Sequence, residues 1–138
     1  MSDAGKTIET DKQRSAIRQI CAAIQHFQND EYECAITLAA AGEGQVPESM
    51  KSYLFRLLKE KLPGYDHNAF SNWLKHPTGP ETATISELEV VVMIARAIQK
   101  FVAAYEATRP EFEEFSKWAV NAGHIPRPLT QKGPGPQP

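Results

Sequence analysis

An apolar stripe within residues 16–41 restricts the fold of this chain more than any other feature. Its members recur at steps of three and four, which puts them on one side of an α-helix. Asn29 and Asp30 interrupt the pattern, and either side-chain oxygen can cap a following helix. An alanine-rich run comes next, and so short a turn makes two helices antiparallel neighbours. The sequence therefore predicts a helical hairpin over 11–28 and 31–41. The stripe consists of Ile17, Ile20, Cys21, Ile24 and Phe27.

Helical periodicity continues beyond the hairpin. The glycines of the segment 42–44 are predicted to end its second helix, because two glycines so close together destabilise helical backbone. No stretch alternates apolar and polar residues in the manner of a strand. The predicted fold class is all-α, a five- to six-helix up-down bundle built on the N-terminal antiparallel hairpin. Proline, glycine and capping patterns bound the further predicted helices, which cover residues 47–62, 68–76, 84–108 and 110–123.

Composition divides the chain into one domain with two polar ends. Its 138 residues are the size of one ordinary domain, and a hydrophobic fraction of 41% is enough for a core. Residues 1–9 are small and polar, which predicts a disordered N-terminus. Residues 124–138 are rich in proline and glycine, which predicts a disordered tail. We therefore predict a single helical bundle domain over 10–123.

The sequence shows no pattern for membrane insertion or export. No apolar run approaches the roughly 20 residues that cross a bilayer, and the first residues lack an apolar signal region. A formal net charge of −2 gives no electrostatic basis for broad nucleic-acid binding. Cys21 and Cys34 form no CxxC pair and are typical of free thiols in a reducing compartment. We expect a cytoplasmic protein with no membrane partner and no cofactor.

Asn72, Lys75 and His76 form the best candidate site. In a helix, positions separated by three and four residues share one face, so an amide, an ammonium and an imidazole come together there. Such a face can hold a phosphate or a polar partner, and histidine can also shuttle a proton near neutral pH. The alternative is an ordinary solvated helix face, with His76 interacting with the carbonyls at the helix C-terminus.

The sequence does not match the patterns of a zinc site or of an aromatic surface that stacks on bases. A zinc site formed by Cys21, His26 and Cys34 does not match the spacing of known zinc ligands. Phe115 and Trp118 recur at helical spacing and are predicted to face the core instead of stacking on bases. We therefore predict no metal site, and the sequence identifies no catalytic residue.

Two stretches together resemble known helical proteins. The segment 23–41, with Tyr32 and Ala35 in a Tyr-x-x-Ala turn, resembles the leading hairpin of HEPN-like proteins. The Asn-x-x-Lys-His motif at 72–76, followed by a long helix and an aromatic helix at 112–118, resembles a group of small bacterial helical proteins. The resemblance implies a homodimeric helical bundle.

The resemblance also directs the functional prediction. Many HEPN domains are metal-independent RNases that use arginine, four to six residues and then histidine. That motif is missing here, since seven residues separate Arg18 from His26. We therefore expect a non-enzymatic interaction or nucleotide-sensing module, whose polar site consists of Asn72, Lys75, His76 and Glu43.

Two alternatives stay open at this point. One is a divergent metal-independent RNase or a nucleotide-handling hydrolase that uses His76 with Lys75 as the charge stabiliser. The other is a protein partner that recognises the proline-rich segment 126–138 as a linear motif. The ligand is thus expected to be a nucleotide, an RNA or a protein, and the dimer face is expected on the alanine-rich hairpin or on the long helix at 84–108.

Overall fold

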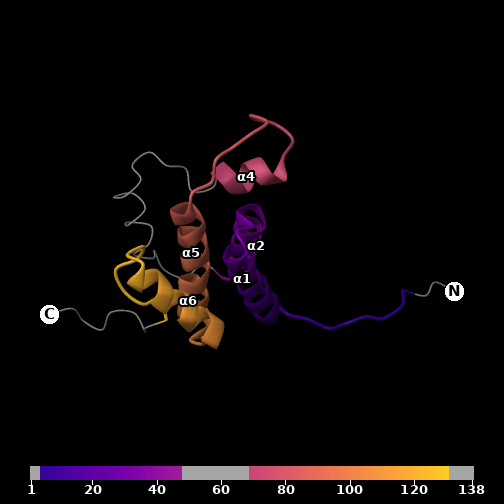
Figure 1. Ribbon diagram of the computed structural model, residues 1–138. Coiled ribbons are helices and arrows are strands. Elements are labelled where there is room, and N and C mark those ends of the chain that lie inside the picture. The colour runs from indigo at the N-terminus through magenta and orange to yellow at the C-terminus, as the bar shows by residue number, and fades with distance from the viewer. Residues whose placement is uncertain (1–3, 48–68, 131–138) are drawn as a thin grey trace.

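The computed structural model describes residues 4–47 and 69–130 (Figure 1). These residues contain no strand, so the all-α fold class is confirmed. The predicted helix over 47–62 lies outside the described residues, apart from Pro47, which is not helical. The described helices are α1 (Lys12–Gln28), α2 (Tyr32–Gly44), α4 (Ala69–Lys75), α5 (Glu87–Tyr105) and α6 (Pro110–Asn121).

Helices α1 and α2 form the predicted hairpin. The carboxylate of Asp11 caps α1 by accepting a hydrogen bond from the backbone N–H of Arg14 at 2.7 Å. The turn between the helices contains Asp30 with a φ of 61°, a left-handed conformation that aspartate tolerates better than most residues. The rings of Phe27 and Tyr32 then stack across the turn, with centroids 5.6 Å apart.

Helix α2 continues three residues past its predicted end at Ala41. Gly42 lies inside the helix and does not end it. Its missing side chain lets α2 lie directly against α1. A Cβ atom at Gly42 would come within 2.8 Å of Ile20 Cγ1, and Ile20 is fully buried. A contact between two helices explains this glycine, whereas the sequence pattern indicated a helix terminator.

Helix α5 is the central element of the core. A capping box formed by Ser86 and Glu89 fixes its first turn, so the helix begins at Glu87, three residues after its predicted start at 84. All residues from Val90 to Ile98 are buried, which shows that the helix is covered on more than one side. The helix ends at Tyr105, three residues earlier than predicted, and Glu106 follows in the left-handed conformation with a φ of 50°.

The segment 124–130 packs onto the bundle, although the sequence predicted a disordered tail from residue 124 onward. Ile125 and Leu129 are each only 2% exposed. The backbone N–H of Leu129 donates a hydrogen bond of 2.7 Å to the buried hydroxyl of Ser116 on α6. The side chains of Ile125 and Leu129, two apolar residues within a proline-rich run, therefore pack against the bundle. Residues 131–138 lie outside the described part of the chain.

One end of the bundle gathers the α1–α2 turn, the start of α5 and the end of α6. Phe27 near the end of α1 contacts Trp118 of α6, with ring centroids 5.4 Å apart. The imidazole of His124 lies 2.7 Å from the carboxylate of Glu87 in the first turn of α5. We call this region the turn end of the bundle. Helix α4 packs on α2 (Figure 1).

Candidate functional site

Helix α4 presents the three polar residues that the sequence singled out. Asn72, Lys75 and His76 are all exposed, and His76 directly follows the last residue of the helix. Leu74 and Trp73 are half-buried, and the indole N–H of Trp73 donates a hydrogen bond of 2.7 Å to the carbonyl of Pro80. This bond fixes the following loop against the helix, so α4 is anchored by its apolar side and leaves its polar side accessible.

A shallow pocket of about 280 Å³ lies between α4 and the hairpin. Leu38 and Leu74 supply its apolar lining, while Glu33 supplies a carboxylate. The Thr37 hydroxyl at its edge donates a hydrogen bond to the backbone carbonyl of Glu33 at 2.9 Å. The pocket therefore combines an apolar lining with an acceptor group. Its lining residues are His26, Glu33, Cys34, Thr37, Leu38 and Leu74.

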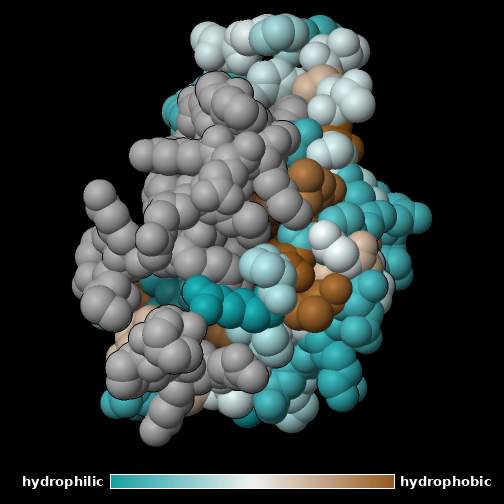
Figure 2. All heavy atoms as spheres, turned by 90° about the vertical axis from the view of Figure 1, so that its left-hand side faces the viewer, coloured by the Kyte–Doolittle hydropathy of each residue, from teal (hydrophilic) through white to brown (hydrophobic). Residues whose placement is uncertain are grey.

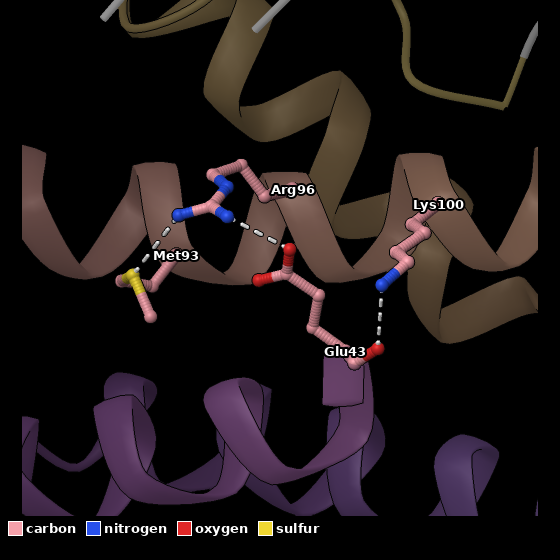
Figure 3. A network of polar contacts seen from close by, with 4 residues as sticks. All are labelled: Glu43, Met93, Arg96 and Lys100. Carbon is pink, nitrogen blue, oxygen red and sulfur yellow. Dashed lines mark hydrogen bonds and ion pairs between the residues drawn. The ribbon is translucent and has the colours of Figure 1, made fainter. Parts of the chain in front are cut away.

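Glu43 forms a separate cluster with α5 (Figure 3). Its carboxylate lies 2.8 Å from the guanidinium of Arg96, and only 7% of Arg96 is exposed. The ammonium of Lys100 donates a hydrogen bond of 3.2 Å to the backbone carbonyl of Glu43. The guanidinium of Arg96 also donates a hydrogen bond of 3.9 Å to the sulfur of Met93. These contacts bind the last turn of α2 to the middle of α5.

Cys34 of the pocket and Glu43 lie on opposite sides of α2, and Leu38 of the pocket lies about 140° around the helix from Glu43. Cys34 and Glu43 are nine positions apart, and at about 100° and 1.5 Å per residue this places the two side chains about 180° around the helix and about 13.5 Å along it from each other. The structure therefore does not bring Glu43 together with Asn72, Lys75 and His76. Its carboxylate instead neutralises a buried guanidinium, which would be costly to bury alone.

Arg96 is the polar residue that the sequence analysis missed. It interrupts the apolar run from Val90 to Ile98, and a charged residue in such a run is almost never buried without a partner. That signal predicts a buried ion pair. It does not identify Glu43 as the partner, because the two residues are 53 positions apart in the sequence.

The pKa values of Cys21 and Tyr32 are raised, and desolvation is the largest cause of both shifts. Burial raises the pKa of the Cys21 thiol from 9.0 to about 11, with the Glu111 carboxylate contributing in the same direction. Desolvation, and then the carboxylates of Glu87 and Asp30, raise the pKa of Tyr32 above its ordinary value. Within residues 4–47 and 69–130, no three His, Cys, Asp or Glu side chains gather in a way that could hold a metal ion.

Comparison with known proteins gives no match to a family model, to a curated protein or to a solved structure. The described helices were also searched for membrane spans, and none combines the length and the apolar character that crossing a bilayer needs.

The surface of the described residues is mixed in character. On the face drawn in Figure 2, hydrophilic residues predominate among the coloured spheres, and a smaller group of apolar residues reaches the surface near the centre of the view. Among the described residues, the α2–α4 pocket and the exposed side chains of α4 are the candidate binding features.

Proposed function

We propose that this chain is a non-enzymatic helical binding module of the HEPN-like type, and that the pocket between α2 and α4 senses a nucleotide. One observation carries the proposal. Leu74 lines the pocket, and Lys75, the next residue of α4, is exposed and can reach its edge. A ligand with an apolar ring and an anionic group can contact both features at once.

The chemistry of the pocket matches the two parts of a nucleotide. The ammonium of Lys75 can bind phosphate as a point charge. A base ring can lie against Leu38 and Leu74, and the carboxylate of Glu33 can accept a hydrogen bond from an exocyclic amine. The volume of about 280 Å³ lies just below the roughly 300–1,000 Å³ that is usual for ligand pockets. We therefore expect a mononucleotide and weak affinity.

Binding is favoured over catalysis because of the position of His76. General acid–base catalysis needs a proton-transfer group held within hydrogen-bond reach of the reacting atom. His76 is exposed and follows the end of α4, which is a poor position for such a group. The H76A variant separates the two readings, because an RNase or nucleotide hydrolase using His76 would lose roughly 10²–10⁴-fold in rate.

Titration calorimetry with AMP and ATP tests the proposed site. The K75A variant should weaken binding by about 2- to 5-fold, as expected for one exposed ion pair. The matched control is K12A, because Lys12 is an equally exposed lysine at the start of α1. Absence of any nucleotide binding, or an equal loss in K75A and K12A, would overturn the proposal.

The homodimer and the up-down order remain parts of the same proposal. The up-down order is supported by the antiparallel hairpin of α1 and α2. For the dimer, the burial of α5 from Val90 to Ile98 favours the alanine-rich hairpin as the contact face, and Ala41 is exposed there. Sedimentation velocity over a wide range of protein concentration tests the dimer, and a constant monomer would argue against it.

A further inference from the structure

Trp118 is an exposed aromatic residue that is held in place by other rings. It is 40% exposed, although the sequence predicted an inward position. Its ring centroid lies 5.4 Å from that of Phe27, 5.8 Å from Phe115 and 5.5 Å from His124. Contacts on several sides restrict the motion of the indole, so a ligand would bind it without ordering a flexible side chain.

The surroundings of Trp118 extend across the turn end of the bundle. Tyr32 is half-buried and stacks on Phe27, which in turn contacts Trp118. His124 links the indole to the start of α5, because its imidazole lies 2.7 Å from the Glu87 carboxylate. We call Trp118, Tyr32 and His124 together the Trp118 surface.

Carboxylates surround this surface. Glu114 is exposed and precedes Trp118 by four residues on α6, which makes the two side chains neighbours on one face of the helix. Asp30 in the hairpin turn is exposed, and Glu87 lies at the start of α5. Glu87 already lies 2.7 Å from the imidazole of His124, so Glu114 and Asp30 are the carboxylates that can complement a cation, with Lys117 as the basic neighbour in sequence. The raised pKa of Tyr32, caused by desolvation and then by Glu87 and Asp30, is consistent with this negative field.

We propose that the Trp118 surface binds an arginine-bearing segment of a partner protein. Tryptophan is the best aromatic acceptor for a cation, and the planar guanidinium also stacks on aromatic rings. The carboxylates of Glu114 and Asp30 complement the charge of the same segment. Exposed tryptophans that are rigid and central are also the residues that contribute most to protein–protein binding. This surface shares no residue with the lining of the α2–α4 pocket, so the inference does not depend on the proposed nucleotide site.

A hexa-arginine amide peptide is a direct probe of this surface. Its binding to the full chain is followed by isothermal titration calorimetry, with a hexa-glutamine peptide as the neutral control. The W118A variant should weaken binding of the arginine peptide by about 3- to 30-fold, the range expected for a cation–π contact. Circular dichroism shows whether each variant is folded.

A pair of surface variants keeps the test independent of folding. E114Q removes a charge next to Trp118 and should weaken binding by about 2- to 5-fold. E113Q is the matched control, because Glu113 is exposed on the same helix but lies about 140° around it from Trp118. A larger effect of E114Q than of E113Q supports the proposal. Equal effects of the two variants, or no preference of the wild-type chain for the arginine peptide, would overturn it.

Discussion

Gly42 of α2 lies so close to Ile20 of α1 that a Cβ atom at position 42 would come within 2.8 Å of Ile20 Cγ1. The neighbouring Gly44 is also helical, but a Cβ atom at that position would meet nothing within 4 Å. The two glycines therefore have different roles although they are only two residues apart. The first permits the close packing of the hairpin, and the second is replaceable.

The G42A variant should be destabilised by about 1–3 kcal/mol, as expected for overpacking in a core, with part of this offset by the higher helix propensity of alanine. G44A is the matched control and should be neutral or more stable by up to about 1 kcal/mol, because only the propensity changes. Urea unfolding of both variants checks this prediction. Equal stability of the two would show that the close contact with Ile20 does not limit the packing.

Removing the Glu43 carboxylate should destabilise the protein strongly. E43A leaves the guanidinium of Arg96 without its acidic partner, and breaking a buried pair in this way costs about 3 kcal/mol or more. The R96M variant and the double variant complete a mutant cycle. We expect a coupling energy of about 0.5–3 kcal/mol between the two positions. A cycle with no coupling would contradict the assignment of Glu43 to a structural ion pair.

The packing of segment 124–130 predicts a measurable loss on truncation of Leu129. L129A removes a side chain that is 2% exposed and should cost about 2–5 kcal/mol, in the range of other buried leucines. The matched control is I8A, since Ile8 is 68% exposed. If both variants unfold at the wild-type urea concentration, the segment does not pack on the core in solution.

The raised pKa of Cys21 predicts a loss of stability in alkaline solution. Folding raises this pKa from 9.0 to about 11, so the unfolded chain releases the thiol proton first. The contribution of Cys21 is therefore fully present below pH 9 and is lost as the pH rises towards 11. The C21A variant should show a smaller decrease in urea midpoint over that interval. An identical decrease in both proteins would show that the Cys21 thiol is not responsible.

Local sequence signals predicted most of the described helices. Some helix ends depend on neighbouring residues, such as the Asp11 cap, so the boundaries of α1 were predicted to within one residue, whereas α5 begins three residues after its predicted start. The end of α2 was predicted wrongly, because Gly42 is explained by its contact with Ile20. That contact joins positions that are distant in the sequence, and a local pattern does not contain it.

The candidate site was predictable only in part. The shared face of Asn72, Lys75 and His76 follows from helical spacing, and all three are exposed in the structure. The grouping with Glu43 was not reliable, because the Glu43 carboxylate pairs with the buried Arg96 of α5, a contact that helical spacing does not reveal. The contribution of Leu38 and Cys34 to the pocket depends on where α4 packs, which periodicity alone does not reveal.

The most direct measurement is a nuclear magnetic resonance titration of the ¹⁵N-labelled chain with AMP. We expect chemical-shift changes at Lys75, His76 and the residues 33–38, with no comparable change around Glu43 and Arg96. The same changes should be reduced in K75A and kept in K12A. An unchanged spectrum, or changes that centre on Glu43 and leave α4 unaffected, would contradict a nucleotide site between α2 and α4.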